Sequence, residues 1–504
     1  MSRASLPPAV LHRLALHRLA LPSAVLLALA AVFLVAWGTR PGPAPAPASG
    51  DQEVAVTSIT RSCPPAAPGA GASRVALIAL SAPTAAAGPA TAPPDTAPPA
   101  GSAVLSTVSA ASAPKAAAAK PFTVSAPGKI ATVTAAGGTG TAVAATGKMA
   151  MGFEAEQSDA AGTGLVSCTH AGSDMWFVGT GQATGASQTW LYLMNTGDVT
   201  ATADLTILTD SGVQPGPGSA VTIQPNQFAA ENVTPYVPGS QAVALHVQTS
   251  SGQVAASAWQ GGSGGGAWLP QAAAPSASLV IPGLTVASSA AKLLVVVPGA
   301  TDAQLKIVAY TPDGAVPQFP GSPVDASAGA ATPVALNSLG ASAAGLKLTS
   351  SVPVVAGVLV PGAGIGSFTT AQSPVSEQGV VAGNPSTRGV TVGLLLTAPA
   401  AAAQVSVSVI SADGTVTAPA ADQGVAVKAS HTVALSLPRP QGSNEPFAIT
   451  VTPAAGSGPV YAVRVVTSGT GGLSAPVTSL LPVASALTSI TLPPARDAYS
   501  AVLP

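Results

Sequence analysis

The stretch ADLTILTDSG at residues 203–212 decides the fold, because a strand-like pattern in it ends in a turn that recurs at a fixed spacing. Apolar and polar residues alternate along it, which is typical of a strand with one buried face. Its last glycine, Gly212, has counterparts in Gly314 and Gly414, each of which also follows an aspartate turn. The glycines lie 102 and then 100 residues apart. A period near one hundred residues predicts a row of similar modules.

Each repeat also closes on a valine-rich strand of similar sequence. These closing strands read GQVAA, PVVAG and PVYAV, at residues 252–256, 353–357 and 459–463. Short strands separated by glycine and proline turns predict an all-β protein, and we expect tandem immunoglobulin-like β-sandwich modules of two sheets each. The alternative is a β-propeller in which every repeat supplies two four-stranded blades. The sandwich is favoured because no half-period near fifty residues is visible.

Residues 51–165 resemble a fourth, degenerate copy of the module. Within it, residues 81–120 are almost wholly Ala, Pro, Ser and Thr, and we expect this insertion to be disordered. The other expected modules are an acidic, tryptophan-rich sandwich at 166–277, a sandwich at 278–378, and a sandwich with a C-terminal tail at 379–504.

The N-terminal region predicts a membrane anchor. Residues 19–37 carry no charge and are long enough to span a bilayer. Three arginines precede them in residues 1–18, so the positive-inside rule places that end in the cytoplasm and the ectodomain outside. Residues 38–50 form a Pro/Ala spacer. The alternative is a cleaved signal peptide and a secreted protein, although no Ala-x-Ala motif directly follows the apolar run.

The composition is unlike that of a cytosolic enzyme, since only 7% of residues are charged and 4% aromatic. Charge is unevenly spread: residues 149–291 contain no Lys or Arg. Eight acidic residues fall in this window: Glu154, Glu156, Asp159, Asp174, Asp198, Asp204, Asp210 and Glu231. We expect an acidic second module, which argues against a nucleic-acid ligand. It could attract a basic partner or a divalent cation, or serve solubility alone.

The second module also collects four of the five tryptophans. We expect Trp190 and Trp259 to be core residues that supply volume among small side chains. Trp176 and Trp268 each lie beside a turn and are the better candidates for exposure.

Exposed indoles next to acidic residues suggest a binding face. We take Trp176, Trp268, Asp174 and Asp198 as its candidate residues, because flat indole faces can stack on sugar rings. A cell-wall glycan or a basic envelope protein would be the partner.

The chain has two cysteines, Cys63 and Cys168, both on the side expected to be exported. Two lone cysteines in an oxidising compartment most simply form a disulfide. They cannot complete a tetrahedral metal site without further ligands nearby, so we expect no metal site.

A resemblance to a known family rests on three segments. They read RSCP at residues 61–64, CTHAGSDMWFVG at 168–179 and LYLMN at 191–195. Together they resemble the actinobacterial family labelled domain of unknown function 5719, and the resemblance covers most of the chain after residue 50. It implies a membrane-anchored envelope protein of unassigned activity, with Cys63 paired to Cys168.

No motif points to catalysis. Gly261–Gly265 matches the Gly-x-Ser-x-Gly nucleophile elbow, but Ser263 lies between two expected strands rather than before a helix, so we expect a hairpin loop. Glu154 and Glu156 share one face of an extended segment, and we expect that face to be solvated. The histidines after the membrane segment are far apart in sequence and are expected to be ordinary residues: His170, His246 and His431. We expect no catalytic residue and no cofactor.

These observations predict a non-catalytic, membrane-anchored cell-envelope protein with a structural, scaffold or binding role. One alternative is a glycan-binding module that acts through the acidic second repeat. Another is a hydrolase with a site between modules, which would need a pocket with convergent polar groups.

Overall fold

The computed structural model describes residues 52–81, 99–112, 121–159, 164–181, 187–217, 220–262, 265–285, 291–316, 323–336, 343–362, 365–419, 422–440, 443–469, 477–483 and 485–492. These residues are all-β, with two short 3₁₀ turns, η2 (Gly147–Met149) and η3 (Thr234–Tyr236), and no α-helix. The chain divides into two compact units, Met1–Val54 with Thr491–Pro504, and Ala55–Ile490. A two-stranded sheet pairs β1 (Gln52–Ala55) with β37 (Ser489–Leu492).

The expected membrane helix at 19–37, its cytoplasmic extension at 1–18 and the spacer at 38–50 lie outside the described residues. Within the described ranges, no helix is long and apolar enough to cross a membrane.

The first repeat forms two sheets. Sheet 1a has the strand order β6 (Ala131–Ala136), β3 (Ala72–Ile78), β8 (Glu154–Ser158), β9 (Val166–Ser167). Sheet 1b has the order β5 (Phe122–Val124), β4 (Ala103–Ala110), β7 (Gly140–Thr146), β2 (Ser58–Cys63).

The second repeat also forms two sheets. Sheet 2a has the order β15 (Gln227–Asn232), β11 (Gln188–Asn195), β17 (Ala255–Gly262), β18 (Gly265–Leu269). Sheet 2b has the order β12 (Ala201–Thr209), β16 (Val243–Ser251), β10 (Asp174–Gly179), β19 (Gln271–Ala272), and β12 also pairs with β13 (Gly212–Gln214) and β14 (Val221–Ile223). A short parallel pairing of β15 with β4 joins sheet 2a to sheet 1b.

In the third repeat a single long strand, β26 (Ala344–Val360), serves both sheets. Sheet 3a has the order β25 (Ala330–Ala335), β21 (Lys292–Val297), second half of β26, β27 (Ser367–Thr370). Sheet 3b has the order β20 (Ser276–Leu284), first half of β26, β22 (Ala303–Thr311), and β22 also pairs with β23 (Gly314–Val316) and β24 (Val324–Ala326).

The fourth repeat returns to two separate sheets. Sheet 4a has the order β33 (His431–Leu437), β29 (Val390–Ala398), β35 (Tyr461–Ser468), β36 (Val477–Pro482). Sheet 4b has the order β28 (Gly379–Asn384), β34 (Phe447–Pro453), β30 (Ala403–Ile410), and β30 also pairs with β31 (Val416–Thr417) and β32 (Val425–Val427).

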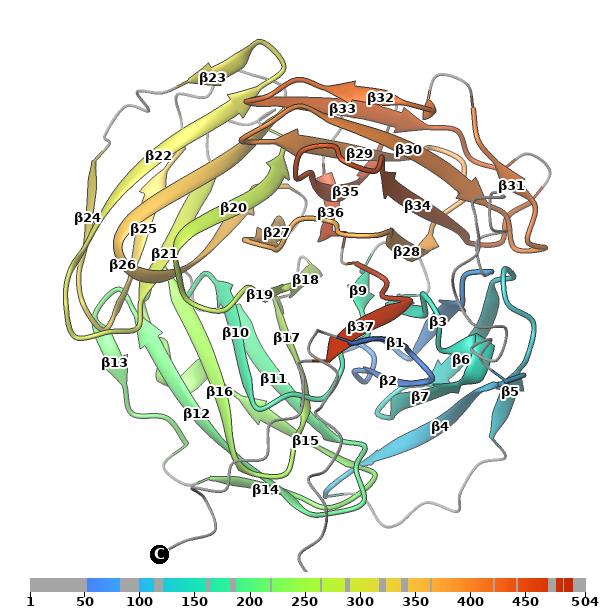
Figure 1. The fold of residues 1–504 in the computed structure, drawn as a ribbon. Helices are drawn as coiled ribbons and strands as arrows, with labels where there is room; N and C mark the ends of the chain where they lie inside the picture. The colour runs from blue at the N-terminus through green and yellow to red at the C-terminus, as the bar shows by residue number, and fades with distance from the viewer. Residues whose placement is uncertain are drawn as a thin grey trace, which may run out of the picture. The chain divides into compact units, whose positions relative to one another are not determined.

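The sheets of Ala55–Ile490 stack face to face in a closed ring, as Figure 1 shows. Apolar cores lie between 1a and 1b, 1b and 2a, 2a and 2b, and 2b and 3a. One continuous core joins 3a, 3b and 4a, another lies between 4a and 4b, and a last one between 4b and 1a returns to the first repeat. Each sheet therefore buries both faces, which removes far more apolar surface from water than a sandwich would.

Strand β21 illustrates why isolated immunoglobulin-like sandwiches are not confirmed. Its residues Leu293 and Val295 pack into the core of their own repeat, whereas Leu294 and Val296 pack against the second repeat. A sandwich module would leave that second face in water. The arrangement corresponds instead to the propeller alternative, in which each repeat supplies two sheets to a ring.

The interpretation of residues 81–120 as a disordered insertion was wrong in part. Residues 103–110 form β4, which pairs with β7 over six residues. The physical reason is the spacing of its apolar residues: Ala103 and Leu105 are buried on one side, and Val108 is buried in the core toward sheet 2a. Residues 82–98 and 113–120 lie outside the described ranges.

The recurrent aspartate turns close similar hairpins. Gly212, Gly314 and Gly414 have φ angles of 98°, 116° and 92°, a region that side-chain-bearing residues avoid. In the first two turns a threonine hydroxyl, of Thr209 or Thr311, donates a hydrogen bond to the carbonyl oxygen of the glycine. These contacts explain why the turn is the part of the repeat most visible in the sequence.

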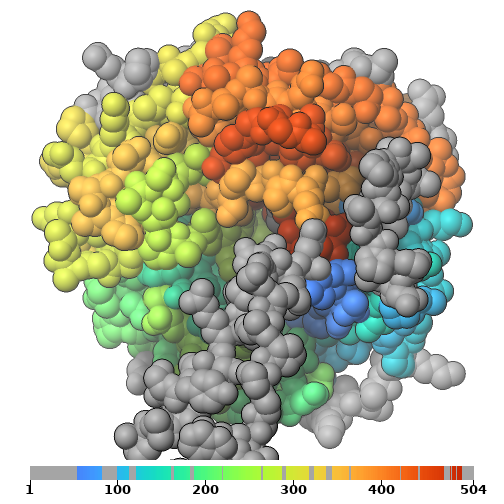
Figure 2. All heavy atoms as spheres, in the orientation of Figure 1, coloured from blue at the N-terminus to red at the C-terminus, as the bar shows by residue number. Residues whose placement is uncertain are grey.

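The ring closes through a buried ion pair between the first and fourth repeats. Arg464 Nη1 of β35 lies 2.6 Å from Glu156 Oε1 of β8, and the two side chains are 0% and 1% exposed. The other carboxylate oxygen of Glu156 accepts a hydrogen bond of 2.8 Å from the backbone N–H of Gly383, in β28. Figure 2 shows the cyan residues of the first repeat beside the orange residues of the fourth.

We predict that Arg464→Met lowers the free energy of unfolding by about 3 to 5 kcal/mol, because it leaves the Glu156 carboxylate buried without its cation. Arg388→Met, at an exposed arginine, is the matched control and should change stability by less than about 0.5 kcal/mol. Adding Glu156→Gln to Arg464→Met should restore part of the loss. Urea unfolding measures all three, and equal stability of the Arg464→Met and Arg388→Met variants would contradict the role of the ion pair.

Candidate functional site

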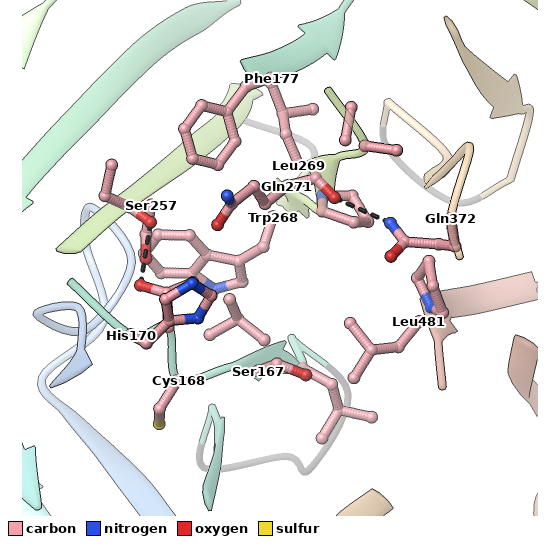
Figure 3. Close-up of a pocket in the computed structure, with 18 of the residues that line it drawn as sticks. Ser167, Cys168, His170, Phe177, Ser257, Trp268, Leu269, Gln271, Gln372 and Leu481 are labelled. Carbon is pink, nitrogen blue, oxygen red and sulfur yellow. Dashed lines mark hydrogen bonds between the residues drawn. The ribbon is translucent and has the colours of Figure 1, made fainter. Parts of the chain in front are cut away.

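A cavity of about 240 Å³ lies where strands from several sheets approach one another at the centre of the ring (Figure 3). Its wall comes from β2, β8, β9, β10, β17, β18, β19 and β36, together with the residues that follow β9 and β27. Four repeats thus contribute to one site. Its apolar wall includes Leu165, Phe177, Trp268, Leu269, Leu480 and Leu481. Its polar wall includes Arg61, Glu154, His170, Ser257, Gln271 and Gln372.

Arg61 and Glu154 form the charged part of the wall. Arg61 lies two residues from both Ile59 and Cys63 along β2 and therefore shares their face of the strand. Those two residues pack into the core toward sheet 1a, so the Arg61 side chain also points toward that sheet. Its Nη2 lies 3.4 Å from Glu154 Oε2, and the side chains are 13% and 8% exposed. The guanidinium Nε is buried and has no hydrogen-bond partner among the described residues.

The environment of Glu154 shifts its ionisation toward neutral pH. Burial raises the pKa of Glu154 to about 7, because desolvation of the carboxylate outweighs the opposing effect of the Arg61 charge. The nearby carboxylate of Glu156 adds to the increase. Burial also lowers the pKa of His170, and the charge of Arg61 contributes to that decrease. The site therefore combines a permanent cation with a carboxyl group that titrates near neutrality.

The expected disulfide is confirmed and lies beside this cavity. Cys63 at the end of β2 is bonded to Cys168 directly after β9, across 105 residues of sequence. Both cysteines are buried, and Cys168 lines the cavity. The bond ties sheet 1b to sheet 1a next to Arg61.

The two tryptophans expected to be exposed are buried instead. Trp176 is 3% exposed, stacks on the His246 ring at a centroid distance of 3.7 Å, and packs against the third repeat. Trp268 is 6% exposed and belongs to the core between sheets 1b and 2a. Both follow turns, but the strand faces that carry them are covered by neighbouring sheets.

The other two tryptophans of the second repeat differ in burial. Trp259 is buried, as expected, in the same core as Trp268. Trp190 is only partly buried, and its indole N–H donates a hydrogen bond of 3.1 Å to Gln188 Oε1. It is thus the most exposed described tryptophan of the second repeat.

The candidate binding face is not assembled as one surface. Asp174 Oδ1 lies 3.0 Å from Nε2 of His246, which stacks on Trp176. Asp198 is exposed in the loop between β11 and β12. Trp268 packs in a different core from Trp176, so the four candidate residues do not share a face.

The expected solvated face at Glu154 and Glu156 was wrong. Both carboxylates are buried and paired with arginines that lie outside the acidic window, Arg61 and Arg464. Both also belong to β8 of the first repeat, so the second module itself carries five of the eight acidic residues in that window. Among the described residues, no group of three or more His, Cys, Asp or Glu side chains could hold a metal ion.

Ser263 itself lies outside the described residues, but its flanks are described. Gly262 and Gly265 pair directly across the β17–β18 hairpin. The segment connects two antiparallel strands, whereas a nucleophile elbow connects a strand to a helix. Of the described residues that line the central cavity, Glu154 is the only carboxylate, whereas glycosidase chemistry uses two.

We predict that the Glu154 carboxyl makes stability fall as pH rises. Because its pKa is higher in the folded state than the ordinary value of 4.5, its contribution is complete below pH 4.5 and is lost as pH passes about 7. Between pH 4.5 and pH 8, the free energy of unfolding of the wild type should fall by roughly 3 kcal/mol more than that of Glu154→Gln. Urea unfolding across this range, with exposed Asp204→Asn as control, tests it. Parallel pH profiles for wild type and Glu154→Gln would refute it.

We also predict that substitutions of the buried Trp176 and the partly exposed Trp190 differ in their effects on stability and on fluorescence quenching. Trp176→Ala should lower the free energy of unfolding by about 3 to 5 kcal/mol, since it empties a packed site. Trp190→Ala should lower the free energy of unfolding by less, because the Trp190 indole is already partly exposed to water. Acrylamide quenching should lose its most accessible component in Trp190→Ala and keep it in Trp176→Ala. The reverse pattern would show that Trp176 is the accessible indole.

Comparison with known proteins finds one family. A family model described as "Family of unknown function (DUF5719)" matches residues 123–438. No curated protein matches the chain.

Proposed function

We propose, from the premise that the chain belongs to the family of unknown function DUF5719, that it is an exported, non-catalytic cell-envelope protein with a binding or scaffold role. The observation that supports export is the buried bond between Cys63 and Cys168. Disulfides persist outside the cytosol and are rare within it. We further propose that residues 19–37 anchor the chain in the membrane, with the ectodomain outside. The alternative is that this segment is a signal peptide and the protein is secreted after its cleavage.

A binding role is supported by the packing of the ring and by its central cavity. The sheets pack against neighbours on both faces, and strands of these sheets supply much of the cavity wall. A preformed concave site with a mainly apolar wall and a few polar groups is the usual form of a small-molecule site. We therefore place the binding function at the cavity rather than on the face of Trp176 and Asp174.

A cell-wall glycan bound on the outer surface is the second candidate. The partly exposed Trp190 is the observation that favours it, since a flat indole at a surface can stack on a sugar ring. Burial of Trp176 weakens the candidate, because this side chain cannot be reached without opening a core. Trp268 is also buried and lines the central cavity, not the outer surface.

We predict that Cys63 and Cys168 are bonded in the native organism and that the intact chain fractionates with the membrane. Protease added to whole cells should remove the ectodomain. Chain produced in a reducing cytosol should lack the bond and be less stable by about 5 kcal/mol, because the denatured state regains the freedom of a loop of 105 residues.

Non-reducing peptide mapping and protease protection measure these properties. Cys63→Ser provides the matched control for the loss of stability. Free thiols at both positions, or an ectodomain that is protected from external protease, would overturn the proposed location. A soluble mature protein would support cleavage instead of anchoring.

A further inference from the structure

The central cavity suggests the chemical class of its ligand. The volume of about 240 Å³ lies below the range of roughly 300 to 1,000 Å³ that is usual for drug-binding pockets. Much of its wall is apolar, with Phe177, Trp268 and Leu481 among the larger side chains. A compact ligand with an apolar body fits such a wall, because its burial removes apolar surface from water.

Arg61 supplies a cation with unused hydrogen-bonding capacity. Its distance of 3.4 Å to Glu154 exceeds the 2.6 Å of the closing pair between Arg464 and Glu156. A guanidinium has five N–H donors, and the buried Nε of Arg61 has no partner among the described residues. Planar guanidinium groups bind carboxylates through two parallel hydrogen bonds when geometry allows. The cavity therefore presents a donor set that suits an anion.

The other charged and polar groups near Arg61 are compatible with an anion in the cavity. Glu156, on the same strand as Glu154, is already bound to Arg464 and does not line the cavity. His170 follows β9 near Arg61, and its pKa is lowered, which favours the neutral ring and leaves Arg61 as the cation of the cavity. Ser257 is 2% exposed and lines the cavity with a hydroxyl that has no described partner.

We propose that the central cavity binds a small organic carboxylate with an apolar body, whose carboxylate is held by Arg61. This inference deepens the proposed binding role and rests on it. Protonation of Glu154 near neutral pH removes the competing negative charge and gives its O–H as a donor to the bound anion. Binding is then accompanied by uptake of a proton when Glu154 is ionised in the free protein.

Benzoate and benzamide form a matched pair of probes, because they have nearly the same shape and differ in charge. Calorimetric titration of the purified full-length chain at pH 6 should show benzoate binding at least tenfold more tightly than benzamide. Arg61→Gln should weaken benzoate at least tenfold and leave benzamide nearly unchanged. Arg388→Gln, at an exposed arginine, is the control for a lost positive charge and should behave as wild type.

The dependence on pH gives a second readout. Benzoate affinity should fall about tenfold between pH 6 and pH 8, as Glu154 ionises with a pKa of about 7. Glu154→Gln should bind benzoate with an affinity that varies little over this range. A wild-type affinity that is independent of pH would show that Glu154 does not take part.

A further variant keeps the proposal testable if Arg61→Gln fails to fold. Ser373 is exposed and lies on the cavity wall after β27, so Ser373→Trp should obstruct the cavity without disturbing a core. It should abolish benzoate binding. Binding that survives both variants, equal affinity for benzamide, or no binding of benzoate by wild type would each overturn the proposal. These binding results are independent of the exported location of the chain, which the protease-protection experiment tests separately.

Discussion

The fold depends on closing the ring between the first and last repeats. Each sheet carries apolar side chains on both faces. An open row of sheets would therefore leave one apolar face of sheet 1a and one of sheet 4b in water. Apolar residues of β3 and β28 cover those faces, and Glu156 meets Arg464 at the same junction. A buried charge is costly without its partner, so the ion pair favours this one pairing of sheets over others. The same closure brings β2 and β8 of the first repeat and β36 of the fourth to one wall of the central cavity.

The sequence was sufficient to predict the repeat, its turns and the all-β class, since these depend on local residue types. It also predicted the disulfide, because the chain has only two cysteines. It was insufficient to distinguish sandwich modules from a ring. Strand β22 alternates between exposed and buried residues, as a sandwich strand does. Strand β21, in contrast, is buried at five successive positions, and such runs indicate burial on both faces. The half-period was invisible because the two sheets of a repeat differ, and in the third repeat they share β26.

The charged part of the site could not be predicted for a related reason. Glu156 and Arg464 lie 308 residues apart, and nothing in either local pattern selects the other. One signal was present: Arg464 stands alone within an apolar strand, where a charge requires a buried partner. The exposure of Trp176 was misjudged because the residues before it predict a turn correctly, while the next repeat covers the strand that follows. In a ring, burial is decided by neighbouring sheets as much as by the strand itself.

The family match and the ring do not have the same boundaries. Residues 123–438 begin within β5 and end after β33, so they omit β2, β3 and β4 as well as β34, β35 and β36. Those strands carry Arg61, Cys63 and Arg464, and they include the paired neighbours of strands inside the match, such as β7 and β30. The matched segment alone would therefore leave sheets incomplete and the ring open. Because the cavity wall draws on both the matched and the unmatched strands, its binding properties belong to the whole of Ala55–Ile490 and not to the matched segment.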